Sequence, residues 1–325
     1  MIPGQSVVVG IDGGGTRSLA LAVDSTGSVL AAANAGSLNF FGSGLPAARR
    51  NLKTLIGVLR RRLPAQTRFR KIIVGCAALF SEATSVEKER LCRGILPLEE
   101  TGVISDCQTA CFGATLGRPG LVVIAGTGSI VIAQNEAGRL TRVGGWGHLL
   151  GDAGSAYWIA VESVKAAIVI EEGPGPKTSL VPVIRRWFGA QTLAGIVPAI
   201  YRSDFAKEHL AELTRHLARK VGSRDAVFRG ICRRAGRELA AQASTALKLA
   251  RLKTRPLPVC LVGGVLTNNA LVRRSLIAAL KQICPVRVAK PKLSPALGAA
   301  AIALVDGGVE LTPGVVARLR THQTW

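Results

Sequence analysis

The chain of 325 residues is longer than one ordinary hydrophobic core supports, so two lobes are the first expectation. Hydrophobic residues make up 48% of it, but no apolar run approaches the roughly 20 residues of a membrane helix, and no signal-like segment opens it. We therefore expect a cytoplasmic protein that does not bind membranes. Lys and Arg exceed Asp and Glu by 42 − 20 = 22, yet no nucleic-acid module or row of aromatic residues accompanies them.

Strands and helices alternate along the first third of the chain. A β-branched run at 7–11 leads into a glycine turn and then a second apolar strand. Leucine and isoleucine recur at helical spacing within 46–63, which predicts an amphipathic helix. In chain order, we expect strands at 7–11, 19–23, 71–75 and 103–106, and helices at 46–63 and 109–115. This alternation predicts an α/β sheet.

The strand, turn and strand pattern recurs after a break at 118–120. A strand at 121–125 leads into Gly126-Thr127-Gly128-Ser129, and the chain beyond is expected to be helical at 155–172 and 204–250. A late strand at 258–262 ends at Gly263-Gly264. The recurrence predicts two lobes of related build, 1–117 and 118–325, with the extreme C-terminus free to pack back on the N-terminal lobe.

Two glycine-rich turns are candidates for holding phosphate. Backbone N–H groups can converge on phosphate oxygens where no side chain blocks their approach. The first turn is Gly13-Gly14-Gly15 with Thr16, and the second is Gly126-Thr127-Gly128 with Ser129. The hydroxyl groups add donors, and Asp12 offers a hard oxygen ligand for Mg²⁺. A glycine turn between strands is more often a plain hairpin, but the presence of two such turns, with the glycine pair at 263 and 264, strengthens the phosphate interpretation.

Asp106 is the candidate general base. It ends an apolar strand and precedes a helix, where carboxylates of α/β sheets commonly face a cleft. By position alone it could equally be the N-cap of that helix. Farther along, five glycines within 144–154 surround Trp146 and Asp152. Trp146 offers a flat face to a sugar ring or fills a core, and Asp152 accepts from sugar hydroxyls or caps the helix near Ser155.

Several of these motifs together resemble the N-acetylglucosamine and glucosamine kinases of the BadF/BadG/BcrA/BcrD ATPase group. This group belongs to the superfamily of actin, hexokinase and the heat-shock chaperone ATPases. The motifs are Asp12-Gly13-Gly14-Gly15-Thr16, Ser105-Asp106, Ala125-Gly126-Thr127-Gly128-Ser129, the segment from Gly144 to Asp152 and Ser155-Ala156-Tyr157-Trp158-Ile159. They occur in the family's order from about Val7 to the 295–301 stretch.

The resemblance implies two ribonuclease-H-like lobes with an active-site cleft between them, Mg²⁺-ATP as phosphoryl donor and the 6-hydroxyl of an amino sugar as acceptor. Asp106 matches the family's catalytic base. The positions that match the sugar-binding residues are Asn39, Gly145, Trp146 and Asp152, with Asp106 beside them. Those matching the phosphate contacts are Thr16, Thr127 and Gly128, and Gly263-Gly264 matches the adenosine-binding turn. The partners expected are therefore an amino sugar and ATP; a homodimer is compatible with this assignment.

Two departures from the family lie near the acceptor. Ala153 replaces the Glu that usually follows the Asp, and Gly75-Cys76-Ala77-Ala78 differs from the expected small-residue loop. The identity of the sugar's 2-substituent is therefore left open. Two other functions also stay open: a non-kinase ATPase of the same fold that acts on a protein partner, and a nucleic-acid-associated protein that uses its positive charge.

Overall fold

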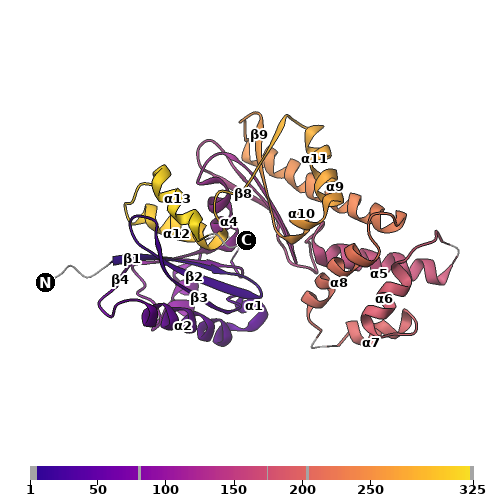
Figure 1. The fold of residues 1–325 in the computed structure, drawn as a ribbon, viewed down its shortest axis with the longest axis horizontal. Helices are drawn as coiled ribbons and strands as arrows, with labels where there is room; N and C mark the ends of the chain where they lie inside the picture. Colours follow the sequence, from indigo (N-terminus) through magenta and orange to yellow (C-terminus); the bar gives the residue numbers. More distant parts are fainter. Residues whose placement is uncertain (1–5, 80–81, 174, 203–204, 323–325) are drawn as a thin grey trace. The chain divides into compact units, whose positions relative to one another are not determined.

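The computed structural model describes residues 6–79, 82–173, 175–202 and 205–322. The chain divides into two compact units, Met1–Gly117 with Pro291–Trp325, and Arg118–Lys290. Figure 1 shows the helices of the C-terminal segment, in yellow, beside the indigo strands of the first unit. No described helix is long and apolar enough to cross a bilayer.

The first unit is built on a five-stranded sheet in the order β3-β2-β1-β4-β5. Strands β1, β2 and β3 form an antiparallel meander, whereas β4 and β5 run parallel to β1. The strands are β1 (Ser6–Gly13), β2 (Arg17–Val23), β3 (Val29–Gly36), β4 (Arg68–Cys76) and β5 (Thr101–Ser105). The helices are α1 (Phe40–Ser43), α2 (Leu45–Arg62), α3 (Ser85–Cys92), α4 (Asp106–Thr115), α12 (Pro295–Asp306) and α13 (Pro313–Thr321).

The second unit repeats this topology, with a sheet in the order β10-β9-β6-β7-β8. Its strands are β6 (Gly120–Ala125), β7 (Ser129–Gln134), β8 (Leu140–Gly144), β9 (Leu257–Val262) and β10 (Val286–Ala289). Its helices are α5 (Ala156–Glu172), α6 (Leu180–Phe188), the 3₁₀ helix η1 (Ala194–Ile196), α7 (Val197–Ile200), α8 (Lys207–Lys220), α9 (Ala226–Ala250), α10 (Gly264–Asn268) and α11 (Ala270–Lys281). The α/β prediction with two related lobes is confirmed by these two sheets.

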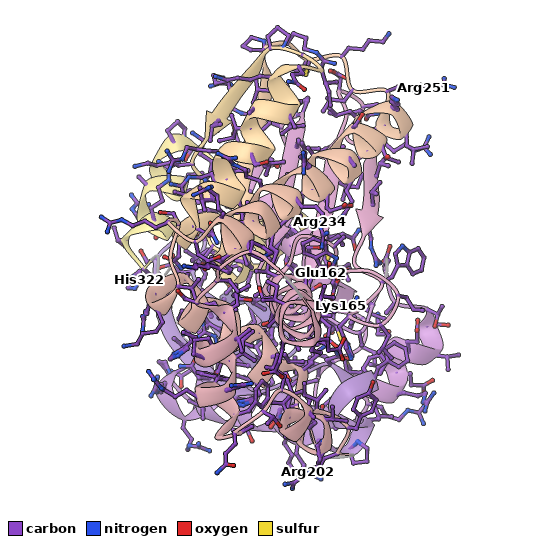
Figure 2. The ribbon with its side chains drawn as sticks, turned by 90° about the vertical axis from the view of Figure 1, so that its right-hand side faces the viewer. Glu162, Lys165, Arg202, Arg234, Arg251 and His322 are labelled. Carbon is purple, nitrogen blue, oxygen red and sulfur yellow. The ribbon has the colours of Figure 1, made fainter. Side chains whose placement is uncertain are left out.

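Hydrophobic periodicity accounts for most of the helices that position the site. The predicted apolar face of α2 is buried, with Leu52, Leu55 and Leu59 fully inaccessible. The helical stretch expected at 204–250 is interrupted, because α8 ends at Lys220 and Asp225 caps a separate helix by accepting from the Phe228 N–H at 3.0 Å. This second helix, α9, is joined to α5 by an ion pair between Arg234 and Glu162, visible in Figure 2.

Candidate active site

The first unit gathers its candidate residues at one edge of its sheet. In the parallel β1–β4 pair Asp12 is opposite Gly75, and in the parallel β4–β5 pair Cys76 is opposite Ser105. The carboxyl ends of three neighbouring strands therefore meet at one edge, where Asp12 is the last residue but one of β1 and Asp106 directly follows β5. This edge is the usual location of ligand sites in open α/β sheets.

Ser105, rather than Asp106, is the N-cap of α4. The Ser105 hydroxyl accepts from the Cys107 N–H at 3.4 Å, and the Gln108 side chain accepts from the Ser105 N–H at 3.1 Å in a capping box. Asp106 is the first helical residue and is only half-buried. The interpretation of Asp106 as the cap is therefore wrong, and its carboxylate is not required to cap the backbone.

The charged form of the Asp12 carboxyl is destabilised by its surroundings, and a bound cation would offset this destabilisation. Burial, and after it the nearby Asp106 carboxylate, raise the pKa of the Asp12 carboxyl to about 6, although Arg17 acts in the opposite direction. Two carboxylates that disfavour each other's charge suit a divalent cation, and Mg²⁺ is commonly held by one or two carboxylates together with substrate phosphates. Within the described residues there is no cluster of three His, Cys, Asp or Glu side chains. The donor set therefore fits Mg²⁺ bound with a phosphate ligand.

The glycine turn of the first unit spans residues 14–16 between β1 and β2. The Gly14 N–H closes the turn by donating to the Arg17 carbonyl at 3.2 Å, so it is not a phosphate donor in this conformation. Among the described residues, the N–H groups of Gly15 and Thr16 make no backbone hydrogen bond, and both residues are exposed. The donors available at this turn are therefore Gly15 and Thr16.

Asn39 lies close to the same turn, because the preceding N–H, of Leu38, donates to the Gly14 carbonyl at 3.3 Å. Its own side-chain oxygen caps α1, accepting from the N–H groups of Phe41 and Gly42 at 3.1 and 3.3 Å. This capping role was not expected from the sequence. It fixes the carboxamide at the start of α1.

The two glycine turns of the second unit meet each other. Strand β9 runs parallel to β6 with Val262 opposite Ile124, so both turns follow the carboxyl ends of neighbouring strands. Gly263 has φ +95°, and a Cβ at this position would lie 2.4 Å from the Ala125 carbonyl oxygen. The contact requires glycine, and it holds the 126–128 turn against the start of α10.

Asp152 and Ser129 connect the 126–128 turn to the Trp-containing segment. The buried Asp152 carboxylate accepts from the Ser129 N–H at 3.2 Å, and a Cβ on Gly128 would lie 2.6 Å from its Oδ2 atom. Burial raises the pKa of Asp152 above its usual range. Helix α5 is capped by the Ser155 hydroxyl, which accepts from Trp158 N–H at 3.1 Å, so Asp152 is not the cap.

The Ser129 hydroxyl does not add a donor to the phosphate turn, contrary to the sequence-based expectation. It is buried and donates to the Ala153 carbonyl at 2.9 Å, while its own carbonyl accepts from the Gly145 N–H at 3.0 Å. The Gly126 N–H closes its turn on the Gly128 carbonyl at 2.9 Å. Exposed Thr127 is thus the turn's accessible hydroxyl donor.

Trp146 is not core filler, because 61% of it is exposed. Leu149 and Leu150 are also exposed, at 82% and 83%, so the middle of this segment presents an apolar surface. His148 is half-buried and packs its ring edge-on against Tyr157, with 4.9 Å between the ring centroids. An apolar ring face beside an acidic group is a typical surface for a sugar.

The predicted residues thus form two groups, one in each unit. Asp12, the turn at 13–16, Asn39 and Asp106 lie together in the first unit. Gly145, Asp152, the turn at 126–128 and the pair at 263–264 lie together in the second, with Trp146 following Gly145 directly.

Sequence reasoning missed Arg142, whose guanidinium donates to the carbonyl groups of Gly144 and Gly145. A single Arg in a strand of so basic a chain carries no local signal of such a role.

Known proteins with related sequences cover most of the chain. The model of the BadF/BadG/BcrA/BcrD ATPase family matches residues 9–303. An N-acetylmuramic acid/N-acetylglucosamine kinase of Clostridium acetobutylicum is 30% identical over 265 residues, which are 80% of this chain and 86% of that protein. An N-acetyl-D-glucosamine kinase of Dictyostelium discoideum is 32% identical over 190 residues, 55% of this chain and 60% of its own length.

Solved structures share the fold at lower sequence identity. A candidate N-acetylglucosamine kinase from Chromobacterium violaceum superposes with a TM-score of 0.72 at 23% identity, covering 92% of this chain and 98% of that one. A glucokinase of the ROK family from Streptomyces griseus, in complex with glucose and AMPPNP, gives 0.55 at 16% identity and similar coverage, 92% and 98%. The family resemblance inferred from the motifs is confirmed by the match over 9–303, and the chain belongs to the BadF/BadG/BcrA/BcrD ATPase family.

Proposed function

We propose that the chain is an ATP-dependent kinase that phosphorylates the 6-hydroxyl of an amino sugar, N-acetylglucosamine or glucosamine. The observation that carries the proposal is the half-buried Asp106 carboxylate, which lies at the sheet edge beside Asp12 while Ser105 caps the helix. The relatives in Clostridium acetobutylicum and Dictyostelium discoideum, both named as kinases of N-acetylated sugars, support this substrate class.

In the proposed reaction Asp106 accepts the proton of the sugar hydroxyl as the oxygen attacks the γ-phosphorus of ATP. The new O–P bond forms while the bond to the β,γ-bridging oxygen breaks, and ADP leaves. Such transfer depends mainly on positioning and charge neutralisation. Asp12 would hold Mg²⁺, which when bound neutralises phosphate charge. The donors of Gly15, Thr16 and Thr127 would orient the phosphate oxygens.

The rest of the nucleotide is proposed to continue from Gly263 along the second unit. Helix α10 starts at Gly264 and leads directly into α11, and a groove of about 330 Å³ opens between α11 and α9. The groove is lined by Arg233, Arg237, Leu271, Arg274 and Ser275. None of its three arginines forms an ion pair with a carboxylate of the described residues, so the groove retains positive charge that favours an anionic ligand.

The sugar is proposed to bind at the 144–152 segment. Trp146 supplies an exposed ring face, and Asp152 supplies a fixed carboxylate that accepts from sugar hydroxyls. Ala153 presents no carboxylate where the family usually has Glu, and its carbonyl is occupied by Ser129 and Gln242. Recognition of the 2-substituent therefore depends on groups other than residue 153.

An ATP-coupled assay across glucosamine, N-acetylglucosamine, N-acetylmannosamine, glucose and anhydro-muramic sugars tests the proposal. We expect sugar-dependent ADP release and a phosphorylated amino sugar, detected by mass spectrometry, with activity lost in EDTA and restored by Mg²⁺. Full-rate ATP hydrolysis without sugar, and with no phosphorylated sugar, would instead identify a non-kinase ATPase.

A further inference from the structure

Arg142 contacts the backbone at the point where the Trp-containing segment begins. It lies in β8, opposite Ile132 of β7. Its Nε donates to the Gly144 carbonyl at 3.1 Å and its Nη2 to the Gly145 carbonyl at 2.6 Å. The guanidinium carbon also lies 5.5 Å from the centre of the Trp146 ring. One side chain therefore touches three consecutive residues of the segment.

The two carbonyl groups need such a partner because of the backbone conformation at this point. Gly144 and Gly145 have φ +81° and +71°, left-handed values at which the strand pairing ends. The Gly145 N–H donates to the Ser129 carbonyl and the Gly144 carbonyl accepts from Arg142, so both polar groups of the Gly144–Gly145 peptide are hydrogen-bonded. A planar guanidinium with two donors suits this arrangement, whereas an ammonium group provides no fixed fork.

The direction of Trp146 follows from this backbone. Because 61% of Trp146 is exposed, core packing constrains its ring only in part. The far end of the segment is held separately, where the Ala153 carbonyl accepts from Ser129 Oγ at 2.9 Å and from Gln242 Nε2 at 3.1 Å. Arg142 thus contacts the Trp146 end of the segment, while Ser129 and Gln242 contact the Asp152 end.

We propose that Arg142 is a positioning residue for sugar binding, which acts by fixing the Gly144–Gly145 backbone and the direction of Trp146. The proposal rests on the proposed function of the segment as the sugar site. Arg142 itself is not assigned to the chemistry; its Nε and Nη2 atoms donate to the two backbone carbonyl groups.

Three variants test the role: Arg142→Ala, Arg142→Lys and, as a matched control, Arg139→Ala. Arg139 is an exposed arginine immediately before the same strand, β8, so its removal changes the charge equally without touching the segment. For Arg142→Ala we expect the sugar KM to rise about tenfold, with ATP KM changed less than about twofold. Arg142→Lys should recover only a small part of the loss, and guanidinium ions added to Arg142→Ala far below unfolding concentrations should recover more.

Hydrogen exchange followed by mass spectrometry separates this proposal from the proposed function. In the sugar-free protein, Arg142→Ala should speed amide exchange in 145–151 and leave exchange in 257–262 unchanged. An unchanged sugar KM together with unchanged exchange would overturn the role of Arg142. Faster exchange in a protein that phosphorylates no sugar would instead retain the backbone role and contradict the kinase assignment.

Discussion

Ser105 and Asp106 are neighbours at the start of α4, but only Ser105 caps the helix. Ser105 satisfies the helix N-terminus through a capping box, and Asp106 leaves its carboxylate at the sheet edge. A substitution at Asp106 therefore removes charge without removing the cap. This separation makes Asp106 a clean test of general-base chemistry.

We predict that Asp106→Asn lowers kcat by about a hundredfold or more, the scale of a positioned base, while ATP and sugar affinities stay close to those of the wild type. Steady-state kinetics and calorimetric binding measure the two effects. The matched variant Ser105→Ala should do the opposite, costing about 1 kcal/mol of unfolding free energy. Near-normal turnover of Asp106→Asn would remove the base assignment.

Asp12 should make stability depend on pH in a metal-free protein. Its folded-state pKa, about 6, lies above the ordinary aspartate value of 3.8, so folding favours the protonated form. The loss of folded-state stability therefore grows between about pH 4 and pH 6 and is complete above about pH 6. It disappears below about pH 4, where the group is protonated in both the folded and the unfolded chain.

The corresponding variant is Asp12→Asn, which has no charge to bury. In EDTA, urea unfolding should find it more stable than the wild type at pH 8 by an amount of order 2 kcal/mol, with the difference shrinking to zero by about pH 4. Equal stabilities at pH 8 would show that Asp12 is not held in the desolvated position described here.

At the scale of elements, the contact between Gly128 and Asp152 joins the phosphate turn to the sugar segment. A Cβ on Gly128 would meet Asp152 Oδ2 at 2.6 Å, and the buried carboxylate has little room to withdraw. By contrast, a Cβ on Gly126 in the same turn meets nothing within 4 Å. The two glycines therefore give a matched pair of substitutions.

We predict that Gly128→Ala raises the KM for both sugar and ATP and costs roughly 1–3 kcal/mol of unfolding free energy, as overpacking usually does. Gly126→Ala should leave unfolding free energy nearly unchanged, as measured by urea titration. A Gly128→Ala protein that loses ATP affinity alone would show that the turn does not constrain Asp152.

Local pattern was sufficient for the turns and strands but not for their contacts. The apolar runs before Gly13, Asp106, Gly126 and Gly263 each predicted a strand end, because each signal lies within a few residues. The Ser129–Asp152 and Arg142–Gly145 contacts depend on the irregular backbone of residues 144–154. The hydrophobic periodicity of the sequence does not predict the path of such a backbone. Strand β3 was also missed, because its alanine-rich sequence has only one of the β-branched residues typical of strands, Val29.

At the scale of the whole molecule, the chain returns to its first unit after completing the second. Residues from Pro291 onward belong with the N-terminal sheet, and α12 packs on α4 and β1 in Figure 1. The crossing of α12 and α4 is unusually close, since a Cβ on Gly298 would lie 2.2 Å from the Thr109 carbonyl oxygen. Because α4 begins at Asp106, the C-terminal segment supports the helix that carries the proposed base.

We predict that Gly298→Ala forces α12 away from α4, lowering the unfolding free energy by about 2 kcal/mol or more and reducing kcat through displacement of Asp106. Gly230→Ala is the control, because Gly230 lies within α9 with open space around its Cβ position. That variant should instead gain about 0.5–1 kcal/mol from helix propensity. Thermal unfolding and hydrogen exchange in 101–115 measure both, and a Gly298→Ala protein with wild-type exchange in α4 would contradict the close crossing.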